Sequence, residues 1–336
     1  MASTVTSNKE IVTEILPFVR VYKDGTVERL TESPFVPPSP YNQHDPETGV
    51  PVSSKDILIS REPTIGARLF LPNLPPNHNQ TTKEKLPILV YFHGGGFFFE
   101  SAFSADHHQF LNSLVSEAKV IAVSVEYRLA PEHHLPIAYE DCWIALQRVA
   151  SLSSTQHKNN DIFEEPWLTD HGDFGRIFLG GDSAGANIAH NIAMRVGKEG
   201  LQNGVKVLGA FLTHPLFWGS SEEDRDEKTM SLINVVWNFV YPSAPCGIDN
   251  PMMNPEGPES PSLAGIGCSR LLVSVAEKDV LRERGIRYYE AVRESGWNGE
   301  IELVDVEGED HAFQILHGDT YNSKNLVKRL ARFLLK

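Results

Sequence analysis

Short apolar runs alternate along this chain with longer stretches of helical pattern, and this alternation constrains the fold more than any other feature. The runs are continuous, without interleaved polar residues, which is typical of strands buried on both faces of a sheet. We predict core strands at residues 86–92, 120–125, 177–179, 208–212 and 271–275, with earlier strands at 57–59 and 67–71 and a later one at 301–306.

Stretches with apolar residues at helical spacing separate these strands. We predict helices at residues 105–118, 138–151, 184–198, 283–295 and 321–335. The alternation of strands and helices predicts the α/β class, with a doubly wound and mostly parallel sheet. Ligands of such sheets bind at the carboxyl ends of the strands, so the residues that follow each strand are the candidates for function.

Two segments interrupt the alternation. Residues 1–50 contain an apolar run and the hairpin-like turn Lys23–Gly25, and they read as an arm. Residues 217–263 contain a helical apolar stripe from Met230 to Val240, followed by a stretch rich in proline and glycine. We interpret the arm and this insertion as a cap on a single domain of residues 1–336; ordinary core packing is the alternative for the stripe.

The stretch GGDSAGAN, Gly180–Asn187, places a serine between glycines where the strand at 177–179 gives way to a helix. A tight strand-to-helix turn needs neighbours with almost no side chain, and it points the hydroxyl of its central serine outward. The pattern predicts Ser183 as a nucleophile. The alternative is a surface turn in which Asp182 or Ser183 caps the helix.

A serine nucleophile needs a general base and a carboxylate that orients this base. Asp279 follows the strand at 271–275, and His311 follows the strand at 301–306. We predict that these two residues complete a triad with Ser183. Glu277, close to the end of the same strand as Asp279, is the alternative acid.

Three glycines follow His93 at the end of the strand at 86–92. Their backbone N–H groups have no side chains in the way, which suits an oxyanion-binding site. We predict that Gly94 and Gly95 donate to the oxyanion, together with the N–H of Ala184, and that His93 holds the loop in shape. A phosphate-binding loop is the alternative, but the lysine and the serine or threonine of such a loop are missing.

Composition and charge exclude several classes of partner. The chain has 30 basic and 44 acidic residues and a net charge of −14, which argues against binding to nucleic acid or to an anionic membrane. No apolar stretch has the length of a signal sequence or a membrane span. The three cysteines are far apart and are interpreted as reduced. We expect a cytoplasmic protein that acts on a small molecule; its oligomeric state is left open.

Histidine pairs are the remaining candidates for a metal site. The pairs His107–His108 and His133–His134 place neighbouring rings on different faces of their elements, and the chain has no H-E-x-x-H motif. We therefore predict no metal ligands.

As a set, these motifs resemble the hormone-sensitive-lipase-like branch of the α/β-hydrolases. The order serine, aspartate, histidine along the chain is the order expected of that fold. The arm, with VYKDG at Val21–Gly25 and DPETGV at Asp45–Val50, is similar to that of plant carboxylesterases of this branch. The resemblance rests on His93–Gly96, on YRLAPEH at Tyr127–His133, on Gly181–Gly185, on Asp279 and on His311.

The resemblance implies an α/β-hydrolase fold with a cap, a hydrophobic acyl or alcohol pocket, and no metal or organic cofactor. Related proteins supply the alternatives. Gibberellin receptors resemble this branch but lack the triad histidine, which His311 provides here. The 2-hydroxyisoflavanone dehydratases and plant alkaloid cyclases are similar in Tyr139–Trp143 and Gly267–Val273, and some members have threonine at the nucleophile position or have lost triad residues.

We therefore expect a serine carboxylesterase that hydrolyses small to medium, uncharged esters through an acyl-enzyme. In this interpretation Ser183 attacks, His311 acts as base and Asp279 orients the imidazole. A dehydratase or cyclase that uses His311 as base without an acyl-enzyme is one alternative. A non-catalytic small-molecule receptor is the other.

Overall fold

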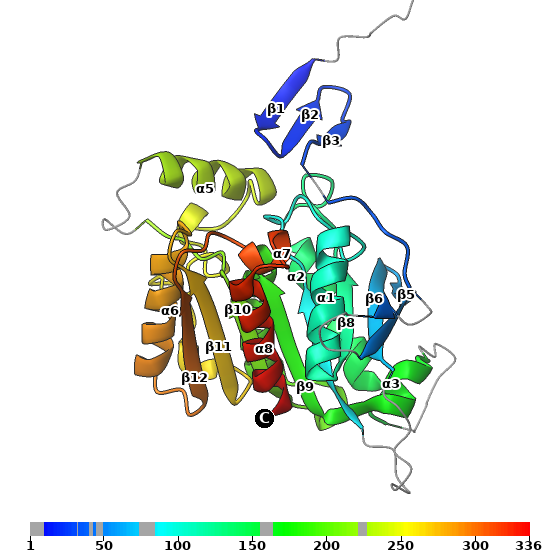
Figure 1. Cartoon of the computed structure of the whole chain (residues 1–336). Helices are drawn as coiled ribbons and strands as arrows, with labels where there is room; N and C mark the ends of the chain where they lie inside the picture. The colour runs from blue at the N-terminus through cyan, green and yellow to red at the C-terminus, as the bar shows by residue number, and fades with distance from the viewer. Residues whose placement is uncertain are drawn as a thin grey trace, which may run out of the picture.

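The computed structural model describes residues 10–31, 33–39, 43–44, 50–73, 85–154, 164–220 and 227–336. These residues form a nine-stranded sheet, in the order β12-β11-β10-β9-β7-β8-β6-β5-β4, and a separate three-stranded sheet (Figure 1). The strands of the large sheet are β4 (Gln43–His44), β5 (Pro51–Arg61), β6 (Thr64–Pro72), β7 (Leu86–Phe92), β8 (Ile121–Glu126), β9 (Gly172–Asp182), β10 (Val207–Thr213), β11 (Arg270–Ala276) and β12 (Glu300–Val306).

The large sheet is parallel from β8 to β12, as the continuous apolar runs predict. β6 and β5 add an antiparallel edge next to β8. Each predicted strand is present, but β9 begins at Gly172, well before its apolar run. Its polar first residues are held by backbone pairing, since Gly172 and Asp173 pair with the start of β7. Side-chain pattern alone therefore underestimates the length of this strand.

All five predicted helices are present within a residue of their predicted bounds. Two short helices, α3 (Pro166–His171) and α7 (Phe313–Leu316), were not predicted, because they have too few residues to show a helical period. The five helices so predicted are α1 (Ala105–Ala118), α2 (Ile137–Ser151), α4 (Ala184–Glu199), α6 (Arg282–Glu294) and α8 (Tyr321–Leu335).

Helices cover both faces of the sheet and create two apolar layers. Along β7, Leu89 and Tyr91 pack in one cluster with residues of α1 and α8, the two helices that lie in front of the sheet in Figure 1. Ile88 and Val90 point the opposite way, into a second cluster with residues of α2 and α4. Burial on both faces explains why these strands lack a polar alternation.

The arm forms its own antiparallel sheet, β1 (Ile11–Ile15), β2 (Val19–Tyr22) and β3 (Val27–Arg29). It stands beyond the edge at which the parallel strands end, near α5 (Glu227–Val240) of the insertion (Figure 1). Ile15 and Val19 are buried against the main apolar cluster. The side chain of Arg29 donates to the carbonyl oxygen of Phe98 at 2.8 Å and forms an ion pair with Glu132.

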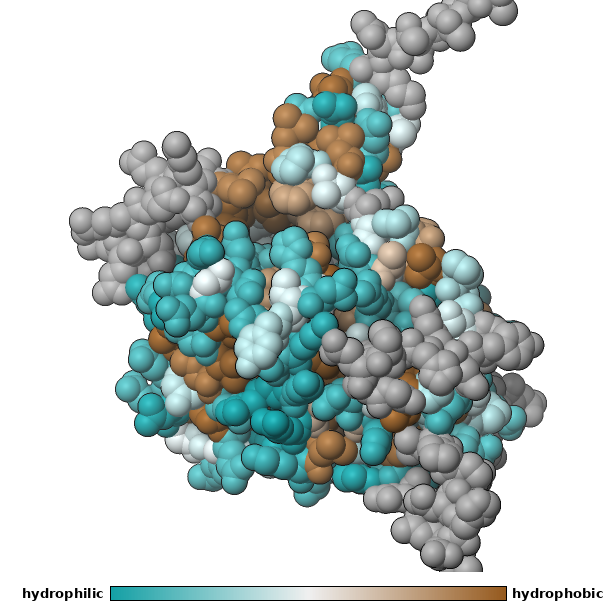
Figure 2. All heavy atoms as spheres, viewed as in Figure 1, coloured by the Kyte–Doolittle hydropathy of each residue, from teal (hydrophilic) through white to brown (hydrophobic). Residues whose placement is uncertain are grey.

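Apolar side chains remain exposed on the arm and on α5, where Figure 2 shows hydrophobic residues gathered at this end of the molecule. The exposed apolar residues are Ile11, Val12 and Leu16 on the arm and Leu232 and Val235 on α5. A surface of this kind beside the carboxyl ends of the strands is suited to contact with an apolar ligand.

Within the described ranges, no helix is both long and apolar enough to cross a membrane. Cys142, Cys246 and Cys268 are free thiols, as their spacing predicts. Parts of the segments interpreted as a cap, residues 1–9, 32, 40–42, 45–49 and 221–226, lie outside the described residues.

Candidate active site

Ser183 occupies the turn between β9 and α4. Its φ of +53° and ψ of −117° lie in a region that residues with a side chain rarely adopt. The turn is fixed from both sides, because the N–H of Ser183 donates to Thr213 O at 2.9 Å and its carbonyl accepts from the N–H of Leu216 at 3.1 Å. The structure thus has the strained strand-to-helix turn that the flanking glycines predict.

The flanking glycines are required by close approach of the backbone. A Cβ atom on Gly181 would lie 2.3 Å from the carbonyl carbon and oxygen of Gly185. A Cβ atom on Gly185 would lie 2.0 Å from the carbonyl oxygen of Phe92. Both distances are shorter than any real contact, so only glycine lets α4 begin against the end of β7. This contact brings Ser183 next to the three-glycine loop.

His311 and Asp279 meet Ser183 at the same edge of the sheet. The Nε2 atom of His311 lies 2.9 Å from Ser183 Oγ, and its Nδ1 atom lies 2.8 Å from Asp279 Oδ2. Asp279 Oδ1 accepts the N–H of Leu281 at 2.9 Å. The alternative acid, Glu277, instead accepts the N–H of Gly308 at 2.7 Å. The structure therefore brings together the three residues that the strand ends predict.

The pKa shifts of Asp279 and His311 favour proton transfer between Ser183 and His311. Burial alone would raise the pKa of Asp279, but hydrogen bonds from His214 and His311 outweigh it and hold that pKa well below its usual range. Burial alone would lower the pKa of His311, whereas its hydrogen bond to Asp279 and the charge of this carboxylate raise it above 6.5. Asp279 is thus an anion at neutral pH and strengthens His311 as a base.

His214 is a second imidazole at Asp279, and the sequence analysis missed it. It directly follows β10 and is fully buried. Its Nδ1 atom lies 3.2 Å from Asp279 Oδ2, and its Nε2 atom lies 2.9 Å from Gln314 Oε1. The rule that residues after a strand are candidates would have found it, had it been applied to the strand at 208–212 as well.

His93 shapes the three-glycine loop, as predicted. Its ring stacks on Tyr127 at 4.2 Å, and the hydroxyl of Tyr127 donates to His93 O at 2.7 Å. Burial, assisted by the positive charge of His107, lowers the pKa of His93 to about 4. The neutral ring donates from Nδ1 to the carbonyl oxygen of Gly94 at 2.8 Å.

The structure corrects the predicted role of Gly94. Its N–H donates to Asp182 Oδ1 at 3.0 Å and so is already used within the protein. Within the part of the chain that the structure describes, no acceptor is recorded for the N–H groups of Gly95, Gly96 and Ala184. Gly95 and Gly96 have φ values of +94° and +59°. The sequence could not reveal this difference, because the acceptor belongs to a distant strand end.

Only one group of side chains in the described residues has ligand atoms close enough for a metal ion. It consists of His214, Asp279 and His311, whose ligand atoms all lie within 4.8 Å of one another. The same atoms are engaged in the hydrogen bonds of the candidate triad. The histidines of the pair at 107–108 point to different partners, one to Asp182 and the other to Arg68.

Comparison with known proteins shows the family to which the chain belongs. A family model described as the α/β-hydrolase fold matches residues 89–315, which include all three residues of the candidate triad. An esterase from Pyrobaculum calidifontis has a similar solved structure, with a TM-score of 0.67, 27% sequence identity and coverage of 84% of each chain.

Two relatives from plants are similar over almost their full length. A 2-hydroxyisoflavanone dehydratase from Glycyrrhiza echinata is 56% identical, over 99% of this chain and 99% of its own. Probable carboxylesterase 2 from Arabidopsis thaliana is 42% identical, over 98% of each chain. The chain belongs to the α/β-hydrolase family, and its relatives include both plant carboxylesterases and 2-hydroxyisoflavanone dehydratases.

Proposed function

We propose that this chain is a serine carboxylesterase that works through an acyl-enzyme. The observation that carries the proposal is the continuous hydrogen-bonded line from Ser183 Oγ through His311 to Asp279. An imidazole 2.9 Å from a serine hydroxyl, and held by a buried carboxylate, is the arrangement that activates a hydroxyl as a nucleophile.

In the proposed reaction, His311 Nε2 takes the hydroxyl proton of Ser183 while Oγ forms a bond to the acyl carbon of the ester. The electron pair of the C=O bond moves to the oxygen, and Asp279 stabilises the imidazolium that forms. His311 then gives its proton to the leaving oxygen, and the alcohol departs. Water repeats these steps on the acyl-enzyme, which releases the acid and regenerates Ser183.

The oxyanion formed in each step needs hydrogen-bond donors at a fixed position. We assign this role to the backbone N–H groups of Gly95, Gly96 and Ala184. In this assignment Gly96 takes the donor role that the sequence predicted for Gly94, because the N–H of Gly94 donates to Asp182. The close contact between Gly185 and the end of β7 supports the assignment, because it places the start of α4 next to the glycine loop.

We also propose that the arm and the insertion, residues 1–50 and 217–263, cap this site. Phe18 of the arm stacks on Phe99 at 5.0 Å, and Phe239 of α5 meets Phe98 edge to face at 5.5 Å. Phe98 and Phe99 lie within three residues of Gly96 along the chain, so this aromatic surface borders the site. An apolar, aromatic border favours small to medium, uncharged esters as substrates.

Dehydration is the second candidate, and the 56% identity to a 2-hydroxyisoflavanone dehydratase favours it. In that reaction His311 would remove a proton next to the substrate ketone, and the N–H donors would stabilise the enolate oxygen. Loss of hydroxide, protonated to water, would complete the step. Ser183 would form no covalent bond, which separates this reaction from ester hydrolysis.

Replacement of the proposed nucleophile tests the assignment. We expect Ser183→Ala to lower kcat for a short-chain chromogenic ester by about 10⁵- to 10⁶-fold, because no acyl-enzyme can form. The measurement is steady-state hydrolysis, with an acyl burst in the wild-type protein. Ser124→Ala is the control, since the Ser124 hydroxyl is buried away from the triad and makes no hydrogen bond within the described residues.

A second variant separates the two candidate reactions. Ester hydrolysis needs both residues, so Ser183→Ala and His311→Ala would each abolish it. Dehydration of a 2-hydroxyisoflavanone needs the base, so His311→Ala would abolish it while Ser183→Ala would retain much of it. Ester turnover that persists in Ser183→Ala would overturn the carboxylesterase proposal.

A further inference from the structure

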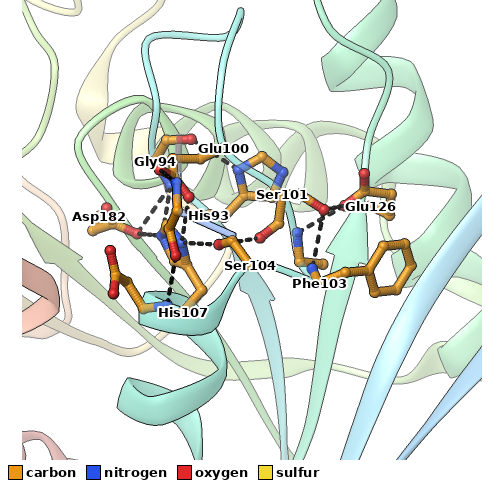
Figure 3. A network of polar contacts seen from close by, with 12 residues as sticks. His93, Gly94, Glu100, Ser101, Phe103, Ser104, His107, Glu126 and Asp182 are labelled. Carbon is orange, nitrogen blue, oxygen red and sulfur yellow. Dashed lines mark hydrogen bonds and ion pairs between the residues drawn. The ribbon is translucent and has the colours of Figure 1, made fainter. Parts of the chain in front are cut away.

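A buried cluster of charged side chains lies beside the three-glycine loop (Figure 3). Asp182 directly precedes the nucleophile, Glu100 is at the far end of the loop, and His107 comes from the first turn of α1. The Nε2 atom of His107 lies 3.3 Å from Asp182 Oδ1. Its Nδ1 atom lies 3.2 Å from Ser104 Oγ and forms a longer ion pair, of 3.6 Å, with Glu100 Oε2. The exposed fractions of the His107, Asp182 and Glu100 side chains are 2%, 5% and 13%. One buried imidazole therefore lies between two carboxylates.

The two carboxylates hold opposite ends of the loop. Asp182 Oδ1 accepts the N–H of Gly94, at the start of the loop, at 3.0 Å. Glu100 Oε1 accepts the N–H of Ser33, which precedes the contact of the arm with α1, at 3.0 Å. His107 is the group that connects these two anchor points.

The loop needs such anchors, because its backbone is strained. Gly95 and Gly96 have positive φ values, and so do Phe97, at +69°, and Glu100, at +66°. Residues with a side chain adopt this region rarely and keep it only where the surroundings enforce it. The conformation that directs the N–H groups of Gly95 and Gly96 is thus maintained by contacts from outside the loop.

The positive charge of His107 strengthens its contacts with the two carboxylates. Burial alone would lower the pKa of His107, but the carboxylates of Asp182 and Glu100 outweigh it and raise the pKa to about 9. At neutral pH the imidazole carries a proton on both nitrogens. Nε2 donates to Asp182, Nδ1 donates to Ser104 Oγ, and the positive charge attracts Glu100 across 3.6 Å. Such an attraction is screened less by water than that of a fully exposed pair.

None of the other titratable groups described next to His107 is a cation at neutral pH, so His107 carries the positive charge of the cluster. Tyr91 of β7 stays protonated, because burial raises its pKa, and its hydroxyl donates to Asp182 at 2.5 Å. His93 stays neutral, with its pKa lowered by burial to about 4. Glu126 of β8 has its pKa raised by burial to about 7, and it accepts hydrogen bonds from the Ser101–Phe103 turn.

We propose that His107 is a positioning residue for the reaction: by bridging Asp182 and Glu100, it holds the glycine loop in the shape that presents its free N–H groups to the reacting oxygen. This inference rests on the proposed function, since it assigns a catalytic use to those N–H groups. Without the bridge, Asp182 and the partly buried Glu100 lose the cation between them, and the loop loses the link between its ends.

His107→Gln tests the bridge, because glutamine keeps a donor but carries no charge. We expect kcat/KM for the ester to fall about 10- to 100-fold, less than the loss on removing an oxyanion donor outright. The loss should lie in kcat, and the affinity for a trifluoromethyl ketone, whose adduct with Ser183 carries an oxyanion, should fall by the same factor. Rates are expressed per active site titrated by the acyl burst.

His108→Gln is the matched control. His108 is the next residue of α1 and is also buried, but its ring contacts Arg68 and Phe70 instead of the loop. We expect its kcat and its affinity for the ketone to change less than about threefold. Wild-type kcat and ketone affinity in His107→Gln would overturn the proposal, as would equal losses in both variants.

The pH profile supplies a readout that a purely structural role would not change. The folded pKa of His107, about 9, lies above its ordinary 6.5, so its contribution is complete below pH 6.5 and is lost as the pH rises through about 9. We expect an alkaline limb of kcat/KM near pH 9 in the wild type. This limb should be absent in His107→Gln and should move to lower pH in Glu100→Gln.

A spectroscopic titration tests the bridge independently of the reaction. In protein with ¹⁵N-labelled histidine, the resonance assigned by its loss in His107→Gln should titrate near pH 9, and at lower pH in Glu100→Gln. Titration below pH 7 in the wild type would overturn the inference. If the wild type binds the ketone but hydrolyses no ester, the proposed function fails, while this titration still decides the bridge.

Discussion

At the scale of single residues, the balance between His311 and Asp279 sets the pH at which the site can work. A general base acts only in its neutral form, and Asp279 raises the pKa of His311 above 6.5. The activity should therefore increase with pH through a midpoint above 6.5. With the loss of the His107 bridge near pH 9, the optimum lies between these two limits.

Asp279→Asn should move the acid limb of kcat/KM to lower pH, because the amide no longer stabilises the imidazolium of His311. It should also lower kcat by about 10⁴-fold, since the amide fails to hold the productive tautomer. The pH–rate profile of the variant provides the measurement. Glu277→Gln is the control, because its carboxylate accepts the N–H of Gly308 and does not contact His311. An acid limb that stays in place would exclude His311 as the titrating base.

Residue identity and spacing predicted Ser183, Asp279 and His311, because each follows a strand and parallel strands end at a common edge. The same reasoning failed for Gly94. Whether a backbone N–H is free depends on an acceptor from another element, here Asp182 of β9, and such long-range pairing leaves no local pattern. His214 was missed for a different reason, because the rule that residues after a strand are candidates was not applied to the strand at 208–212.

At the scale of elements, periodicity predicted the long helices and the buried strands but not how the arm contacts the body. The arm contacts the body through interactions such as the stacking of Phe18 on Phe99 and the ion pair of Arg29 with Glu132. Contacts between segments far apart in the sequence produce no periodic signal. The short helix α7 was not predicted because its four residues form about one turn, which is too short to show a helical period.

Phe18→Ala should loosen the proposed cap without changing the triad. We expect KM for esters with bulky acyl or alcohol groups to rise about three- to tenfold, because a stacked aromatic pair and its buried surface are lost. The kcat for a small acetyl ester should stay within about twofold, since no catalytic group touches Phe18. The measurement compares kinetic constants across an ester series of increasing size.

Val12→Ala is the control for this cap experiment. Val12 lies on β1 of the same arm, and 55% of its surface is exposed. We expect all esters to behave as with the wild type. A uniform change across the ester series in Phe18→Ala would show that the arm affects folding and not access to the site.

At the scale of the whole molecule, the buried core between the sheet and its helices includes polar side chains that stay uncharged in the folded protein. His190 of α4 is buried, accepts the hydroxyl of Tyr288 at Nδ1 at 2.9 Å and lies edge to face with Phe217. Burial lowers its pKa to about 3. The apolar surroundings that stabilise the sheet thus also make the fold sensitive to acid.

His190→Gln should reduce the loss of stability on acidification. The folded pKa of about 3 lies below the ordinary 6.5, so between these values the unfolded chain binds a proton that the folded chain does not, and stability falls as the pH falls. From pH 7 to pH 5 this one residue should lower the free energy of unfolding by about 2 kcal/mol. The free energy of unfolding, measured with urea, should fall between pH 7 and pH 5 by about this much less in His190→Gln than in the wild type. All other titrating groups contribute equally to both proteins. Tyr288→Phe is the control, because it removes the hydrogen bond but keeps the histidine, and it should retain the wild-type pH dependence of stability. Equal pH dependence in His190→Gln and the wild type would show that His190 is not a source of the acid sensitivity.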